Sequence, residues 1–195
     1  MSPLRVGILV FDDVEELDFV GPWEVLGMAA RLVPGSLNMR LISLRGGSIR
    51  AAYGLKIEAS DPVDASGRLD LLIVPGGKGA RALLKEGAIL DFIRRAHAEG
   101  TVVASVCTGA LVLASAGLLD GRRATTHWAA LDDLRAYPKV SVEHQRVIDL
   151  GKVVTSAGIS AGIDMSLHFV SRFLGLERAR EVANRLEYRW EPGEG

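Results

Sequence analysis

Three runs of almost unbroken apolar residues predict strands that are buried on both faces of a sheet. They lie at residues 4–10 (LRVGILV), 69–74 (LDLLIV) and 101–106 (TVVASV). Further strands are expected at residues 39–44, 123–126, 146–149 and 152–156, with a hairpin over residues 49–59. Helical patterns cover residues 21–32, 80–85, 89–99, 109–116, 128–136, 161–174 and 177–188, and residues 190–195 form a tail.

The alternation of buried strands with helices indicates an α/β fold, a mainly parallel sheet with helices on both faces. No linker, repeat or low-complexity segment interrupts the pattern, so we expect one domain over residues 1–195. Ligands of such sheets bind at the carboxyl ends of the strands. That rule directs attention to the loops at residues 12–23, 75–79, 106–110, 126–128 and 157–162.

Charge and cysteine content narrow the classes of function. The formal net charge is −1 and the basic residues are scattered, which predicts no nucleic-acid partner. The single cysteine excludes a disulfide within the chain, and residues 1–10 indicate a strand rather than a leader peptide. Residues 100–119 carry no charge, but their Ser, Thr and Gly residues favour a buried strand and helix over a membrane span. We therefore expect a cytoplasmic protein with no membrane partner.

Cys107 is the first candidate for chemistry. It lies in the segment SVCTGA, where a buried strand gives way to a helix with almost no loop between them. A helix N-terminus favours the thiolate, so this position predicts a thiol pKa below its ordinary value and a nucleophilic cysteine. A packed core cysteine is the equally weighted alternative, because free cysteines are among the most buried residues.

A second candidate is GISAG at residues 158–162, which matches the serine elbow G-x-S-x-G. The downstream Asp164 and His168 are four residues apart on one predicted helix, so they cannot both surround Ser160. A Gly-rich turn beside a pocket, with Ser160 as helix N-cap, is the favoured interpretation.

The segment GKGARA at residues 77–82 matches the residue pattern of a dinucleotide-binding fingerprint. The next strand does not end in the acidic residue that such a site requires. We expect no cofactor. Instead the N–H groups of Gly76 and Gly77 are predicted to point into the cleft and, with the N–H of Thr108, to form an oxyanion hole.

The four histidines show no metal-ligand spacing with Cys or carboxylates, so no metal site is expected. His127 stands apart, because TTHW at residues 125–128 ends a short strand and could bring the imidazole to Cys107. The alternative is a half-buried histidine at a strand end.

Five motifs in this order resemble the ThiJ/PfpI superfamily, also called class I glutamine-amidotransferase-like. They are GPWE (21–24), PGG (75–77), VCTG (106–109), TTHW (125–128) and SAGISAGID (156–164), and the resemblance runs from residue 4 to about 188. It implies a flavodoxin-like three-layer sandwich, a cysteine at the elbow and, in most members, a homodimer.

The resemblance also implies a reaction class. Most members carry Glu in the first loop, where this chain has Asp18, and the proteolytic members have His after the cysteine, where it has Thr108. Asp18, Cys107-Thr108 and GIxAGID are most similar to bacterial isocyanide hydratases. For that reaction the Cys107 thiolate would attack the small-molecule substrate R–N≡C to give a thioimidate, and protonated Asp18 would supply the proton. Thr108 would offer a donor near the cysteine, and Ile159 and Trp23 would form apolar pocket walls.

Three alternatives stay open. Asp18 is also suited to capping the helix that GPWE opens. The same motifs resemble the sensing domains of AraC-type regulators, so a stand-alone ligand-sensing or oxidative-stress module is a second function. A glyoxalase- or deglycase-like enzyme is a third, although such enzymes usually employ the Glu that Asp18 replaces.

Overall fold

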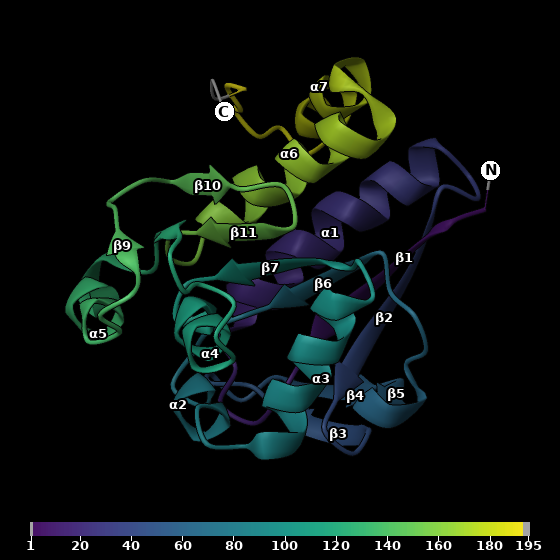
Figure 1. The fold of residues 1–195 in the computed structure, drawn as a ribbon. Coiled ribbons are helices and arrows are strands. Elements are labelled where there is room, and N and C mark those ends of the chain that lie inside the picture. The colour runs from purple at the N-terminus through teal and green to yellow at the C-terminus, as the bar shows by residue number, and fades with distance from the viewer. Residues whose placement is uncertain (1, 193–195) are drawn as a thin grey trace.

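The computed structural model describes residues 2–192, which form a three-layer α/β sandwich around a seven-stranded sheet (Figure 1). The strands follow the order β10-β11-β7-β6-β1-β2-β5, and all neighbours are parallel except β10 and β11. They are β1 (Leu4–Leu9), β2 (Leu37–Ser43), β5 (Asp61–Pro62), β6 (Leu71–Val74), β7 (Val102–Val106), β10 (Val147–Asp149) and β11 (Val153–Ser156).

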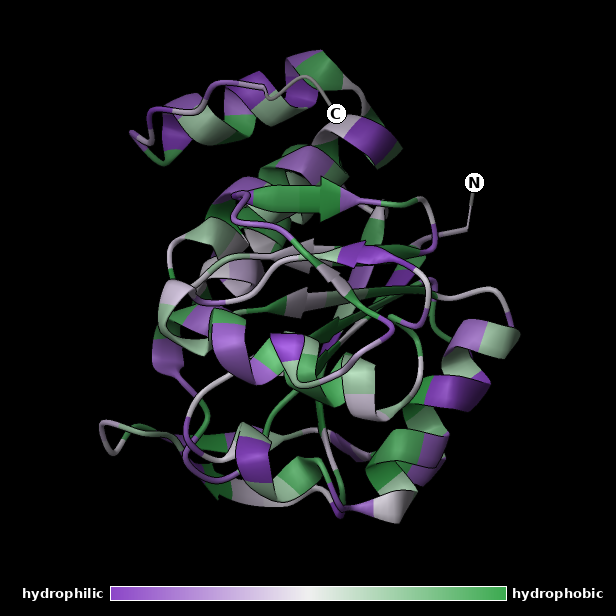
Figure 2. Cartoon of the chain, turned by 60° about the vertical axis from the view of Figure 1, so that its left-hand side comes forward, coloured by the Kyte–Doolittle hydropathy of each residue, from purple (hydrophilic) through white to green (hydrophobic). Residues whose placement is uncertain are grey.

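Helices cover both faces of the sheet. On one face α1 (Glu16–Leu32), α6 (Ala161–Leu174) and α7 (Leu176–Arg185) pack together, and on the other α2 (Ala80–Leu83), α3 (Gly87–Ala98) and α4 (Gly109–Ser115) do so. Most helical ribbons in Figure 2 alternate between hydrophilic and hydrophobic residues, as expected for helices with one buried stripe. The inner strands β6 and β7 are buried at every position. The predicted α/β sandwich is therefore confirmed.

Two smaller sheets lie outside the sandwich. The predicted hairpin is present as β3 (Gly47–Arg50) and β4 (Lys56–Ala59). The strand expected at residues 123–126 is reduced to β8 (Arg123–Ala124), which pairs with β9 (Ser141–Val142). Between them the predicted helix at 128–136 divides into a 3-10 turn, Trp128–Ala130, and α5 (Leu131–Arg135). A further 3-10 turn spans Val63–Ala65.

Helix α1 begins at Glu16, five residues before the predicted start at residue 21. Pro22 consequently lies inside the helix rather than at its first position. Its ring removes the N–H donor of one i→i−4 hydrogen bond of the helix. The early start places Asp18 within the first turn of α1, so the prediction that Asp18 caps a helix starting at Gly21 is wrong.

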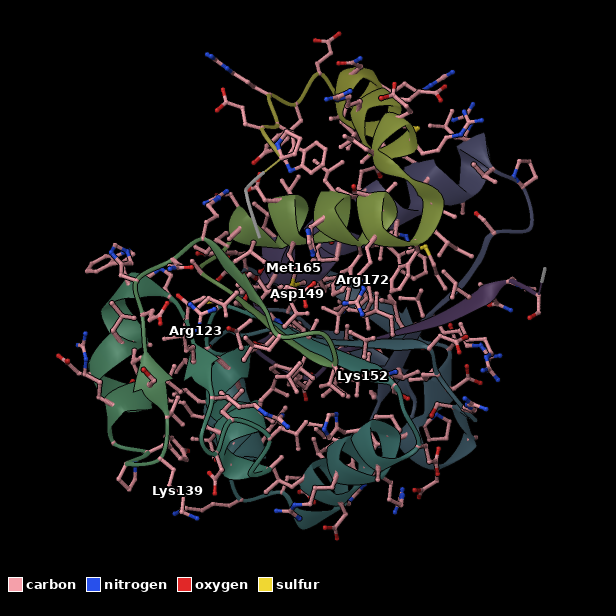
Figure 3. The ribbon with its side chains drawn as sticks, turned by 45° about the horizontal axis from the view of Figure 1, so that its top comes forward. Arg123, Lys139, Asp149, Lys152, Met165 and Arg172 are labelled. Atoms are coloured by element: carbon pink, nitrogen blue, oxygen red, sulfur yellow. The ribbon has the colours of Figure 1, made fainter. Side chains whose placement is uncertain are left out.

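Asp149 anchors the edge strand β10 to α6. Its carboxylate lies 2.7 Å from Nε2 of His168 and 3.3 Å from the Arg172 guanidinium, and Figure 3 shows Asp149 beside Arg172. These contacts fix β10 against the helix that follows the 157–160 turn. The predicted tail starts at Trp190, and its residues 193–195 lie outside the described part of the chain. Within that part, no helix is long and apolar enough to cross a membrane.

Candidate active site

Cys107 occupies a sharp turn at the carboxyl end of β7. Its φ angle of 56° is in the left-handed region, which few residues other than glycine adopt. The backbone on both sides holds this conformation: the Cys107 N–H donates to the Ala157 carbonyl at 3.0 Å, and the Cys107 carbonyl accepts from the Thr126 hydroxyl at 2.7 Å. The side chain is 7% exposed. A buried thiol on a strained, well-held turn is typical of a functional elbow.

Glycines make the elbow possible. A Cβ added to Gly109 would come within 2.1 Å of the Val74 carbonyl oxygen, so α4 starts directly against β6 only because residue 109 has no side chain. A Cβ on Gly76 would lie 2.5 Å from the Thr108 nitrogen. The loops after β6 and β7 therefore touch each other at the backbone.

Asp18 faces this elbow from α1. The residue is fully buried, and its Oδ2 accepts a hydrogen bond from the Gly76 N–H at 2.9 Å. Its Oδ1 is buried and has no hydrogen-bond partner among residues 2–192. The Cys107 side chain is close enough to this carboxyl to lower its pKa. The structure therefore brings together the acid and the thiol that the sequence singled out.

The pKa values of both groups are raised. Burial and, to a smaller extent, the Glu15 charge raise the pKa of the Asp18 carboxyl, the Gly76 N–H and other neighbours act against the rise, and the pKa is about 7. Burial likewise raises the pKa of the Cys107 thiol to about 12, with the Asp18 charge as the next cause. The prediction of a lowered thiol pKa is wrong, because burial and a facing carboxylate outweigh the helix N-terminus.

One negative charge is thus shared between Asp18 and Cys107 over a wide pH range. The first proton leaves near pH 7 and the second near pH 12, so between these values the pair holds a single proton. Because the carboxyl has the lower pKa, the shared proton resides mainly on the sulfur, and the minor arrangement is a thiolate beside a neutral carboxylic acid. That arrangement contains a nucleophile and a proton donor in contact, whereas two separate charges would repel each other.

The N–H groups of Gly76 and Gly77 are engaged inside the protein. The Gly76 N–H binds Asp18, and the Gly77 N–H donates to Oγ1 of Thr108 at 3.0 Å. The expectation of free donors pointing into the cleft is therefore wrong for these two groups. They orient the acid and the threonine, and the Thr108 backbone N–H and hydroxyl lower the pKa of Cys107 against the larger effect of burial.

Ile159 has a second strained backbone beside the cysteine. Its φ angle is 53°, although β-branched residues seldom adopt positive values. The Ile159 backbone N–H lowers the pKa of both Cys107 and Asp18, against the dominant effect of burial on each. Ile159 also lines a cavity of about 420 Å³.

His127 and Trp128 lie on the wall of that same cavity. The His127 Nδ1 accepts from the Ala129 N–H at 3.2 Å, and its ring fills the space that a Cβ on Gly158 would need. No hydrogen bond joins His127 to Cys107 in the part of the chain described. Trp23, predicted as a pocket wall, lies on α1, is 37% exposed and does not line this cavity.

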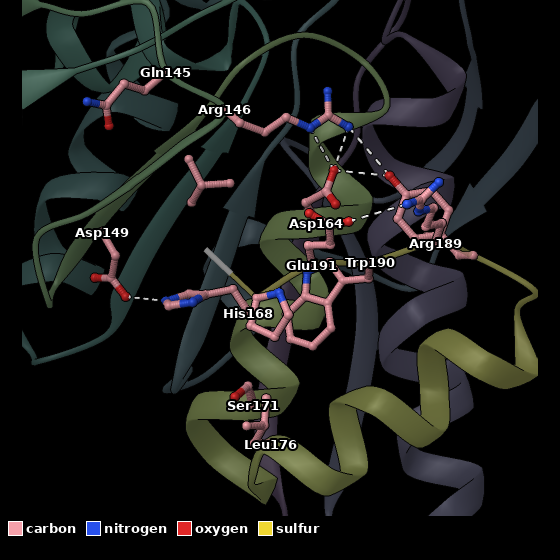
Figure 4. A pocket seen from close by; sticks show the side chains of 13 residues that line it. Gln145, Arg146, Asp149, Asp164, His168, Ser171, Leu176, Arg189, Trp190 and Glu191 are labelled. Carbon is pink, nitrogen blue, oxygen red and sulfur yellow. Dashed lines mark hydrogen bonds and ion pairs between the residues drawn. The ribbon is translucent and has the colours of Figure 1, made fainter. Parts of the chain in front are cut away.

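Ser160 takes no part in a serine triad. Ser160 is the N-cap residue of α6, as predicted, but its hydroxyl makes no capping bond and instead accepts from the Arg146 guanidinium at 3.1 Å. Asp164 pairs with Arg146 and His168 with Asp149, as Figure 4 shows. Among residues 2–192 no cluster of three or more His, Cys, Asp or Glu side chains could hold a metal ion.

Sequence reasoning missed three contributors. Thr126, which holds the Cys107 carbonyl, was visible only as part of the TTHW motif. Glu15, whose charge raises the pKa of Asp18, sits in an acidic run that gave no indication of which member faces inward. Arg146 gave no local signal at all.

Comparison with known proteins decides the family. The sequence profile of the DJ-1/PfpI family matches residues 4–172. The chain belongs to the DJ-1/PfpI family. It is 37% identical over 185 residues to the isonitrile hydratase of Pseudomonas putida, covering 95% of this chain and 78% of that protein. A ThiJ/PfpI family protein from Pseudomonas syringae has a similar structure, with a TM-score of 0.88 and 27% identity over 98% of this chain and 78% of its own.

Other DJ-1/PfpI relatives have different roles. The HTH-type transcriptional regulator CdhR of Pseudomonas aeruginosa is 33% identical over 87% of this chain, which spans 50% of the regulator. Protein DJ-1 homolog A of Arabidopsis thaliana is 31% identical over 89% of this chain and 45% of its own length. Membership of the DJ-1/PfpI family is therefore compatible with an enzymatic or a regulatory function, and the chemistry of the site is needed to distinguish the two.

Proposed function

We propose that this protein is a cysteine-dependent hydratase that converts isocyanides to N-formamides. The observation that carries the proposal is the pairing of the fully buried Asp18, whose pKa is raised to about 7 by burial, with the buried thiol of Cys107. Transfer of the thiol proton to this carboxyl gives a thiolate beside a carboxylic acid, which are the nucleophile and the acid that hydration requires. The similarity to an isonitrile hydratase over 95% of the chain supports the same reaction.

The reaction proceeds in three balanced steps. The Cys107 thiolate forms a C–S bond to the terminal isocyanide carbon, and that carbon takes the Asp18 proton, giving the thioimidate R–N=CH–S–Cys107. Water then adds to the same carbon, with one of its protons passing to nitrogen. Finally the C–S bond breaks, the hydroxyl proton returns to the Asp18 carboxylate, and R–NH–CHO leaves with the thiolate regenerated. Every proton in these steps is carried by Asp18, by water or by the substrate nitrogen.

Neighbouring groups orient this chemistry. The Thr108 hydroxyl accepts from the Gly77 N–H and lowers the pKa of Cys107, and the Gly76 N–H donates to the Asp18 carboxyl. The cavity lined by Ile159, His127 and Trp128 is the place we propose for the substituent R, since it adjoins the turn that faces the cysteine. We further propose that the protein works in the cytoplasm as a homodimer, as the family resemblance implies.

A ligand-sensing module is the second candidate, favoured by the 33% identity to a regulator. An oxidative-stress sensor agrees less well with the structure. Redox-sensing cysteines are exposed and have lowered pKa values, whereas Cys107 is 7% exposed and burial raises its pKa to about 12. A glyoxalase- or deglycase-like reaction is disfavoured by the aspartate at position 18.

Turnover of an aryl isocyanide, followed by the appearance of its N-formamide, tests the proposal. Wild-type protein should produce formamide in many-fold excess over protein, and Cys107→Ala should not. The same protein preparation is assayed in parallel with methylglyoxal, which tests the glyoxalase-like alternative. Saturable binding of the isocyanide without formamide would favour the sensing module instead.

A further inference from the structure

Arg146, at the start of the edge strand β10, contacts several parts of the chain at once. Its Nε lies 2.8 Å from Oδ2 of Asp164, and its terminal nitrogen binds the same oxygen and, at 3.1 Å, the Ser160 hydroxyl. Tyr188, beyond the end of α7, donates its hydroxyl to Asp164 at 3.1 Å. Figure 4 shows the Arg146 guanidinium with its hydrogen bonds to Asp164. The first turn of α6 and the chain after α7 are thus joined through one side chain.

Backbone hydrogen bonds also connect Arg146 to Cys107. The Arg146 carbonyl accepts the Ala157 N–H at 2.9 Å, and the Ala157 carbonyl in turn accepts the Cys107 N–H at 3.0 Å. Arg146 therefore holds the 157–160 turn at its beginning, through the main chain, and at its end, through Ser160.

The turn between these two attachments is strained. Ile159 has a φ angle of 53° despite its branched Cβ, and such a conformation persists only where the surroundings impose it. Ser160 offers no side-chain cap to α6, so its hydroxyl is available to Arg146. Loss of the guanidinium would free one end of the turn and let Ile159 relax toward negative φ. Relaxation would change the position of the turn whose Ala157 carbonyl accepts the Cys107 N–H.

We propose that Arg146 is a positioning residue that holds the 157–160 turn, and with it Ile159, against Cys107. This role extends beyond the proposed function, because it concerns the state of the thiol rather than the identity of the substrate. The inference rests on the proposed function in one respect only, because both take Cys107 as the nucleophile. The Ile159 N–H lowers the pKa of both members of the pair, so its loss should raise both.

The test is the pH dependence of Cys107 alkylation by iodoacetamide in Arg146→Gln. The inflection expected near pH 7 should move up by about one pKa unit, so the rate at pH 6 should fall about tenfold. Arg146→Lys keeps a positive charge beside Asp164 but loses the fork that reaches Ser160, so it should restore the rate only in part. Ser160→Ala, a smaller change that removes one contact, should slow alkylation about threefold.

Arg180→Gln is the matched control, since Arg180 forms a similarly exposed 2.8 Å ion pair with Glu177 within α7. Its alkylation profile should equal that of the wild type, with thermal unfolding of all variants compared in the same buffers. A wild-type profile in both Arg146→Gln and Ser160→Ala would overturn the inference. This readout needs no isocyanide, so failure of the proposed hydratase activity is seen separately, as wild-type protein that is alkylated normally but yields no formamide.

Discussion

Replacing Asp18 with asparagine should stabilise the fold while it destroys the activity. The folded protein raises the pKa of this carboxyl from 3.8 to about 7, chiefly by burial. Between these values the unfolded chain releases the proton and the folded chain keeps it, so stability falls as the pH rises. Above pH 7 the folded state has to bury the charge. The difference of about three pKa units corresponds to about 4 kcal/mol.

The asparagine side chain of this variant would have no charge to bury. The free energy of unfolding of Asp18→Asn should therefore match that of the wild type near pH 4 and exceed it by about 4 kcal/mol at pH 8.5. Turnover should fall on the order of 10²-fold or more, because an amide supplies no acidic proton. A variant that gains stability and loses activity is expected where a buried charge destabilises the fold but is needed for catalysis.

Urea unfolding followed by circular dichroism at pH 4 and pH 8.5 measures the effect. Asp132→Asn is the control, since the Asp132 side chain is 94% exposed and burial contributes nothing to it. Equal stability of wild type and Asp18→Asn at pH 8.5, or the same fall with pH in both, would refute the assignment of a buried carboxyl with a raised pKa.

Two further outcomes follow from the geometry of the site, and a third follows from the proposed homodimer. Alkylation of Cys107 should accelerate as the pH rises through about 7, where the pair loses its first proton, and this inflection should be absent from Asp18→Asn; an unchanged inflection would assign it to another group. Gly76→Ala should cost about 2 kcal/mol of stability in urea unfolding, since its Cβ would meet the Thr108 nitrogen at 2.5 Å, and wild-type stability would contradict the close approach. Light scattering at micromolar concentration should give twice the chain mass, and the mass of one chain would exclude the proposed homodimer.

Much of the fold could be predicted from local pattern. The buried strands β1, β6 and β7 appeared as apolar runs, the hairpin as an alternation around Tyr53-Gly54, and α6 begins and ends where its apolar spacing does. Helix α1 was predicted too short because Pro22 looks like a first helical residue, and only packing against the sheet shows that the helix continues through it.

The site was harder to predict because its chemistry depends on contacts between distant segments. Position on a strand end singled out Cys107 and Asp18, but the direction of the thiol pKa is set by burial and by the facing carboxylate. The N–H groups of Gly76 and Gly77 are not the free donors that the sequence predicted, because they donate to Asp18 and Thr108. Hydrogen bonds between residues so far apart in the sequence cannot be predicted from a local sequence pattern.

Formation of a covalent intermediate on Cys107 tests the central claim most directly. Wild-type protein is mixed with an aryl isocyanide, quenched in acid during turnover, digested and analysed by mass spectrometry. The account predicts one added substrate mass on the peptide that contains Cys107, decaying at the rate at which N-formamide appears. Formamide production by Cys107→Ala at the wild-type rate, or turnover by the wild type with no adduct on that peptide, would contradict it.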